Sequence, residues 1–314
     1  MSADFLHDHP QFAELIRIVA RQKRIDPALV EKDYWIMHCL YGLQQLGFKF
    51  ELKGGTSLSK GFEIINRFSE DIDIRIEPPL ERDVKTGRNQ TKPAQIQSRK
   101  DFYDWVASTI QIEGIDKVER DTAFDNKEFF SAGIRLSYKT ANGRLEGLRE
   151  GVLLELGFDD VIPNTPKDIR SWAYDYAADK VDIVDSRAKG VACYDPRYTF
   201  VEKLQTISTK FRKQQESRDS PIEFMRHYYD VYCLLKRPEV QTFIGTDEYK
   251  AHKARRFPRA DNQNIAQNEA FILNGPATRR SYEEAFTKSS ALYYGDKPTF
   301  EQVLTAIGEA IDQL

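Results

Sequence analysis

Apolar and polar residues alternate along four stretches in the first half of the chain. The pattern has period two, which predicts strands that each bury one face. These stretches are residues 48–53, 71–76, 131–139 and 151–158. Residues 28–46 instead carry apolar side chains at helical spacing, directly after an Asp-Pro pair that can cap and begin a helix.

The pattern changes after Pro196, where helical spacing dominates. A further helix is predicted before that point, at residues 97–112, after a polar stretch at 78–96 that we expect to be a loop. The later predicted helices are 199–213, 222–236, 280–292 and 298–313. We therefore predict an α+β protein, with a mixed sheet flanked by helices in residues 1–195 and a helical lobe in 196–314. The default ligand position is a cleft between the two lobes.

Bulk composition limits the functions to consider. The chain has 314 residues, of which 40% are hydrophobic and 30% charged, as in soluble globular proteins. Its formal net charge of −3 excludes a uniformly basic nucleic-acid binder. Nucleic-acid contact would have to come from local patches, such as the basic segments 210–213 and 252–259, whose alternative interpretation is solvated helix ends.

The sequence also predicts a cytoplasmic location. The three cysteines are scattered, odd in number and without metal-ligand spacing, which is typical of a reducing compartment. We expect no leader, because the first residues lack a basic region followed by an apolar one. No apolar run is long enough for a membrane span.

A glycine-rich turn, Gly54-Gly55-Thr56-Ser57, links the first predicted strand to a short helix predicted over residues 56–65. A turn that opens a helix presents free backbone N–H groups to a phosphate. Lys60, which lies in the short helix predicted after this turn, is a further candidate contact with a nucleotide. The alternative is a tight connection that needs positive φ and is closed by hydroxyl caps.

Two acidic residues follow on alternate positions of the second strand. Period two places Asp71 and Asp73 on one face, where they could share two Mg²⁺ ions for displacement at phosphorus. Arg67 and Ser69, just before them, are candidate phosphate contacts, although Arg67 could instead pair with Glu70.

A third carboxylate would complete a two-metal site. Glu155 is the best candidate, because it interrupts an apolar strand, where a lone charge is costly without a partner. The alternative is a carboxylate on a wet face of the sheet.

The helical lobe contributes two further candidates. Lys203 could point into the cleft and neutralise triphosphate charge, or it could be a solvated lysine. Asp230 interrupts the apolar run 228–232 and could orient Lys203 or a ribose hydroxyl, or it could pair with Arg226 one helical turn away.

At these residues the chain resembles the AbiEii/AbiGii-type nucleotidyltransferase toxins, a branch of the DNA polymerase β-like superfamily. The gap between the glycine turn and Asp71 is longer than in typical superfamily members, a feature of this branch. The resemblance spans roughly residues 28–310, and its matching blocks are residues 31–35, 53–62, 67–73, 200–204 and 228–232.

The resemblance implies a polymerase β-like lobe that transfers a nucleotide from an NTP with Mg²⁺. It also implies an RNA acceptor, notably the acceptor end of tRNA, and a cognate antitoxin. By that analogy Gly55, Thr56 and Ser57 hold phosphate. By the same analogy Asp71 and Asp73 hold metal. Lys203 and Asp230 then occupy the remaining motif positions.

Two other functions remain open from the sequence. The same chemistry could nucleotidylate a small molecule or a protein hydroxyl. A non-catalytic nucleotide-binding module is the third possibility, although the intact pair of aspartates argues against a loss of activity.

Overall fold

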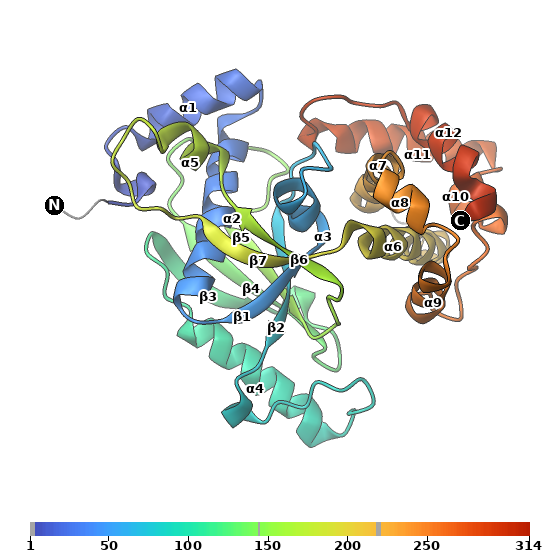
Figure 1. Ribbon diagram of the computed structural model, residues 1–314, viewed down its shortest axis with the longest axis horizontal. Helices are drawn as coiled ribbons and strands as arrows, with labels where there is room; N and C mark the ends of the chain where they lie inside the picture. The colour runs from blue at the N-terminus through green and yellow to red at the C-terminus, as the bar shows by residue number, and fades with distance from the viewer. Residues whose placement is uncertain (1–3, 144, 218–220) are drawn as a thin grey trace. The chain divides into compact units, whose positions relative to one another are not determined.

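The computed structural model describes residues 4–143, 145–217 and 221–314 (Figure 1). The first three residues, on which the expectation of no leader partly rests, lie outside these ranges. The chain divides into two compact units. The first comprises residues 1–62 and 69–194, and the second comprises 63–68 and 195–314. The short segment 63–68 therefore belongs with the C-terminal half of the chain.

The first unit is built on a mixed seven-stranded sheet with the order β3-β4-β5-β2-β1-β7-β6. The two central strands, β1 and β2, are antiparallel, and β2 pairs in parallel with β5. The strands are β1 (Lys49–Lys53), β2 (Asp71–Glu77), β3 (Ile115–Asp121), β4 (Ser131–Tyr138), β5 (Val152–Gly157), β6 (Asn164–Ile169) and β7 (Ala188–Tyr194).

One face of this sheet is apolar and carries the core. Ile72, Ile74 and Leu154 on this face are fully buried, because helices α2 (Pro27–Gln45) and α4 (Pro93–Thr109) cover it. Aromatic contacts join the layers: Trp35 of α2 stacks on Tyr138 of β4, with ring centroids 4.8 Å apart. The remaining helices of this unit are α1 (Phe12–Lys23), α3 (Gly54–Thr56) and α5 (Trp172–Ala177).

The opposite face of the sheet is polar. Register places Asp73 between Lys53 on β1 and Glu155 on β5, and Gly133 on β4 follows Glu155 in the same row. Because partners in register point to the same side of a sheet, these side chains share one face. The polar face therefore carries the candidate acids.

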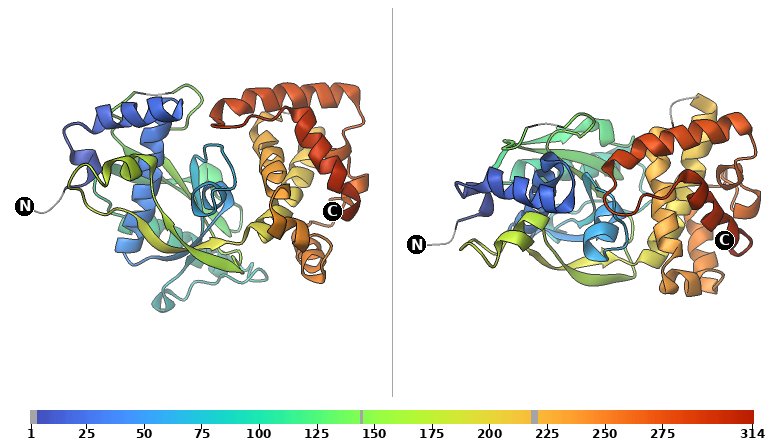
Figure 2. Two further views of the ribbon diagram at one scale, coloured as in Figure 1. Left: turned by 45° about the horizontal axis from the view of Figure 1, so that its top comes forward. Right: turned by 90° about the horizontal axis from the view of Figure 1, so that it is seen from above.

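The second unit is helical (Figures 1 and 2, yellow to red). Its long helices α6 and α7 pack against each other, and α11 and α12 pack on α7. The helices are α6 (Pro196–Ser217), α7 (Ile222–Leu235), α8 (Pro238–Phe243), α9 (Asp247–Arg256), α10 (Glu269–Ile272), α11 (Pro276–Ser289) and α12 (Phe300–Ala310).

The segment 63–68 is anchored in this unit by backbone pairing. Arg67 forms an antiparallel bridge with Tyr293, and the Phe68 N–H donates to the Leu292 carbonyl at 2.9 Å. Ile65 and Phe68 are buried. The second unit therefore contains a piece of chain that comes from the middle of the first.

The α+β fold is confirmed, and so are the four predicted strands and the long predicted helices. The helix expected over residues 56–65 begins earlier and is shorter: α3 continues directly into a π-helix, Ser57–Gly61, and residues 62–65 are not helical. The loop expected over 78–96 is shorter, because α4 already begins at Pro93. Among the described helices, none combines the length and the apolar character that a membrane span requires.

Candidate active site

The acidic pair lies at the beginning of β2, on the polar face of the sheet. Asp71 is buried and Asp73 is half-buried. Asp71 is in register with Leu153 and Asp73 with Glu155 of the parallel strand β5. Two carboxylates two positions apart on one strand thus have a third carboxylate beside them on the neighbouring strand.

The glycine turn touches this pair directly. Gly54 has φ +69°, and a Cβ added at this position would lie 2.1 Å from Asp73 Oδ2. Glycine is required here for two reasons, since other residues rarely adopt this φ and none would leave room for the carboxylate. Thr56 Oγ1 donates to the Asp71 carbonyl at 2.7 Å, which fixes the turn against the beginning of β2. Gly55 is buried in the same turn.

Ser57 and Lys60 have other surroundings in the structure. The Ser57 hydroxyl is fully buried beside the Cys193 thiol. Lys60 Nζ lies 2.6 Å from Asp33 Oδ1 and 4.1 Å from the centre of the Trp172 ring. Burial lowers the pKa of Lys60, although Asp33 opposes this shift. The phosphate contacts expected of these two residues stay predictions, and the structure gives both side chains a role in holding the turn.

The donor set fits a hard divalent cation in part. Mg²⁺ is usually bound through one or two carboxylates, with water and substrate phosphate as the other ligands. Asp71 and Asp73 supply two carboxylates on one strand face. Among the described residues, however, no group of three acidic, histidine or cysteine side chains is close enough to hold a metal ion. Glu155 is adjacent in register, and its role as a ligand stays a prediction.

A buried network that the sequence did not indicate lies next to Asp71. Lys32 Nζ, on α2, is 3.4 Å from Glu70 Oε2 and donates to the Arg149 carbonyl at 2.6 Å. The Arg149 N–H donates to Glu70 Oε2 at 3.1 Å. Arg149 Nη1 lies 3.5 Å from Asp71 Oδ2. Burial lowers the pKa of Lys32, and the nearby Glu70 and Asp71 oppose that shift.

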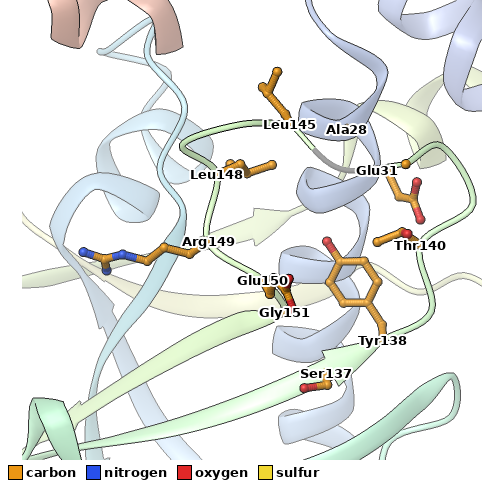
Figure 3. Close-up of a pocket in the computed structure, with 11 residues that line it drawn as sticks. Ala28, Glu31, Ser137, Tyr138, Thr140, Leu145, Leu148, Arg149, Glu150 and Gly151 are labelled. Atoms are coloured by element: carbon orange, nitrogen blue, oxygen red, sulfur yellow. The ribbon is translucent and has the colours of Figure 1, made fainter.

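A pocket of about 80 Å³ lies next to Arg149, between α2 and the residues 145–151 that precede β5. Glu31, Tyr138 and Leu148 are among its lining residues (Figure 3). Ligand sites typically enclose about 300–1,000 Å³, so this pocket is too small to enclose a nucleotide. Figure 3 shows the Arg149 side chain extending away from the other lining residues.

The second unit holds its own buried charged cluster. Arg67 donates to both carboxylate oxygens of Asp230, from Nε at 2.6 Å and from Nη2 at 2.8 Å. Lys203 Nζ lies 2.9 Å from Asp230 Oδ2. Asp230 thus contacts Lys203, as one of the two interpretations of the sequence expects, and its orienting role stays a prediction. Arg67, expected to contact phosphate or Glu70, is paired with Asp230 instead, and this ion pair takes the place of the alternative with Arg226.

Electrostatics fix the charge states of this cluster. Burial alone would raise the pKa of Asp230, but the Arg67 guanidinium and the Lys203 ammonium outweigh it and lower that pKa. Burial lowers the pKa of His227 well below its ordinary value, and the positive charge of Lys203 lowers it further. Asp230 is therefore an anion held by two cations, and His227 is neutral at 3.4 Å from Lys203.

The other candidate contacts are more exposed. Ser69 is half-buried between Arg67 and Asp71 in the chain. In the basic segment 252–259, His252 is buried and Arg256 lies 3.3 Å from Glu202, while Arg255 and Arg259 are exposed. Contact of these basic side chains with RNA stays a prediction.

The geometry defines a class of protein. A mixed sheet that carries two aspartates on alternate positions, against a glycine turn, is what a nucleotidyltransferase site requires, and the catalytic role of these residues stays a prediction. The chain belongs to the family described as nucleotidyl transferase AbiEii toxin, type IV toxin–antitoxin system, whose model matches residues 38–306. Membership of that family confirms the resemblance found in the sequence motifs.

Two solved structures are similar to the chain. MenT4, a nucleotidyltransferase toxin from Mycobacterium tuberculosis H37Rv, is 14% identical with a TM-score of 0.48, over 94% of this chain and 98% of that one. An antigenic nucleotidyltransferase-like protein from Paracoccidioides brasiliensis is also 14% identical, with a TM-score of 0.35, over 83% of this chain and 96% of that one. A search of curated proteins found no match.

Proposed function

We propose that this toxin transfers a nucleotide from an NTP to RNA with Mg²⁺, and that the acceptor end of tRNA is the favoured target. The observation that carries the proposal is the contact between Gly54 and the Asp73 carboxylate. It joins a turn suited to phosphate and a pair of aspartates suited to divalent ions in one site.

Asp71 and Asp73 hold the metal in this proposal, with Glu155 as the third ligand. Bound Mg²⁺ neutralises charge on the phosphates and lowers the barrier to attack by a hydroxyl. Gly54, Gly55 and Thr56 fix the triphosphate through their backbone. Asp71 also serves as the base that takes the proton of the acceptor hydroxyl.

We further propose a role for Lys203 and Asp230 of the second unit. Lys203 neutralises triphosphate charge, and Asp230 keeps its ammonium in one orientation, as the 2.9 Å ion pair supports. Arg67, held on both oxygens of Asp230, restrains the aspartate in turn. The exposed Arg255 and Arg259 are candidates for contact with the RNA backbone.

Family membership also supports the partners. A toxin of a type IV toxin–antitoxin system implies a cognate antitoxin. We propose that both act in the cytoplasm, where NTPs and tRNA occur and where the three free cysteines stay reduced.

The direct test is to incubate the purified protein with total RNA, Mg²⁺ and each labelled NTP in turn. We expect one NTP to label RNA of tRNA size, and we expect EDTA to abolish the signal. If the label appears on a protein or a small molecule and not on RNA, the acceptor is that molecule and the assignment to RNA is wrong. No turnover of any NTP would leave a nucleotide-binding module without catalysis.

A further inference from the structure

The segment that leads into β5 is fixed at several points by charged side chains. Glu31 accepts hydrogen bonds from the backbone N–H groups of Ala141 and Asn142, at 2.7 and 2.9 Å. Arg135 Nη1 donates to the Glu150 carbonyl at 2.9 Å. Lys32 and Glu70 hold the carbonyl and the N–H of Arg149. The backbone at Arg149 is therefore immobilised from both sides.

The ion pair that holds this backbone is unusually buried. The side chain of Lys32 is 1% exposed and that of Glu70 is 10% exposed. A buried ion pair adds little to stability compared with apolar side chains of the same size, because both ions lose their hydration. Its geometry indicates a positional role, since both partners also bond to the backbone of Arg149.

Although the Arg149 backbone is held in place, the Arg149 side chain is 41% exposed to solvent. Its guanidinium lies 3.5 Å from Asp71 Oδ2 and 5.5 Å from the centre of the Phe124 ring. A guanidinium presents several donors in a planar fork that matches the oxygens of a phosphate. The structure thus presents an accessible anion-binding group beside a catalytic aspartate, on a fixed backbone.

Strand order decides which phosphate this group can reach. In the order β5-β2-β1, the glycine turn follows β1 and Arg149 precedes β5, so they flank the aspartates of β2 on opposite sides. In-line displacement at phosphorus places the attacking and the leaving oxygen on opposite sides of the phosphorus atom. If the triphosphate tail lies at the glycine turn, the acceptor approaches from the β5 side.

We propose that Arg149 is the residue of the first unit that binds a backbone phosphate near the 3′ end of the RNA acceptor. It thereby holds the acceptor hydroxyl toward the aspartates. Lys32 and Glu70 are positioning residues, because they act through the backbone of Arg149. This inference rests on the proposed transfer to RNA and adds the group that receives the acceptor.

The test compares Arg149→Ala and Arg149→Lys with Arg88→Ala as the matched control. Arg88 is also an exposed arginine in an ion pair with an aspartate, Asp159, at 2.7 Å. We expect Arg149→Ala to raise the KM for bulk tRNA about 10-fold or more and to leave the KM for NTP within about 2-fold. Arg149→Lys should restore part of the loss, and the control should match the wild type.

Binding without catalysis gives a second readout. The anisotropy of end-labelled tRNA, measured without NTP at several salt concentrations, reports the number of phosphates that the protein neutralises. Loss of one contact to a single strand should reduce the slope of log K against log[salt] by about 0.7. The melting temperature of each variant shows that the protein is folded.

The possible results separate this inference from the proposed function. An unchanged tRNA KM and salt slope in Arg149→Ala, beside an active wild type, would overturn the inference alone. A raised KM for NTP with an unchanged KM for tRNA would assign Arg149 to the triphosphate and overturn it equally. If the wild-type protein neither binds nor labels RNA, the proposed function fails and this inference with it.

The positioning role has its own test in the double variant Lys32→Met/Glu70→Met, which removes both charges of the ion pair together with both hydrogen bonds to the Arg149 backbone. We expect it to fold and to raise the KM for tRNA as Arg149→Ala does. Adding Arg149→Ala to it should produce no further increase, because all three substitutions remove the same contact. Fully additive effects would show that Lys32 and Glu70 act elsewhere.

Discussion

Substitution of Gly54 by alanine tests whether the glycine turn sets the position of Asp73. At φ +69° a side chain costs about 1–2 kcal/mol relative to glycine. The new Cβ would also lie 2.1 Å from Asp73 Oδ2, so the carboxylate must leave its rotamer, at a further cost of about 0.5–1.5 kcal/mol. We expect the free energy of unfolding to fall by about 1.5–3.5 kcal/mol, the sum of these terms.

The matched control is Gly190→Ala. Gly190 has φ +62°, and a Cβ there would meet no atom within 4 Å. This variant has the same backbone strain without the clash, so it should lose only about 1–2 kcal/mol. The difference between the two variants isolates the displacement of Asp73.

Activity should separate the two variants more strongly than stability does. A catalytic group displaced by about 1 Å can lower the rate about 100-fold. Urea unfolding gives the stabilities, and incorporation of labelled NTP into RNA gives the rates. If Gly54→Ala keeps the activity of Gly190→Ala to within about 3-fold, the turn does not position Asp73 for catalysis and the reasoning is refuted.

Three further predictions concern individual side chains. Asp71→Ala should abolish RNA labelling and change the free energy of unfolding by less than about 1 kcal/mol, because its ion pair with Arg149 is long and partly solvated. Continued labelling would contradict the role of Asp71 as a metal ligand. Lys203→Ala should raise the KM for NTP and cost about 1–3 kcal/mol in urea unfolding, since Asp230 loses one of its two buried cations; an unaltered NTP dependence clears Lys203 of this role. Burial lowers the pKa of His38 and His252 to about 4, so the unfolded chain takes up protons first. Stability should therefore be complete above about pH 6.5 and decline as the pH falls toward about 4. A flat profile in pH-dependent urea unfolding would show that these histidines do not contribute.

The inner strand β7 was missed, because its buried positions do not alternate. Strands β1, β2, β4 and β5 were predictable from sequence because burial imposes a strict period on them. The edge strands β3 and β6 were not, since Ile115–Asp121 and Asn164–Ile169 bury few side chains. Where one face of a strand is not covered by apolar neighbours, alternation no longer marks it. The helix expected after the glycine turn ends at Gly61, earlier than predicted. A Cβ at Gly61 would lie 2.8 Å from Cys193 Sγ, a tertiary contact that no local pattern indicates.

The candidate site shows the same division. The aspartates and the glycine turn are close in sequence, so their spacing carries the information. The partners of Lys60 and Arg67 are Asp33 and Asp230, the latter 163 positions away, and no local pattern connects them. A signal for Lys32 existed, since it lies in the block 31–35 that resembles the family, but its partners Glu70 and Arg149 emerge only when the chain is folded.

The excursion of residues 63–68 into the C-terminal unit has a consequence for dissection of this toxin. The polypeptide passes between the units three times, at residues 62–63, 68–69 and 194–195, so one protease cut in the last connection cannot release either half. A fragment that stops near residue 195 would leave Ile65 and Phe68 without the helical unit that buries them, and the backbone of their segment without its partners Leu292 and Tyr293. Such a fragment should be insoluble alone and recoverable on co-expression with the remainder, which makes a split version of this toxin conditional on reassembly.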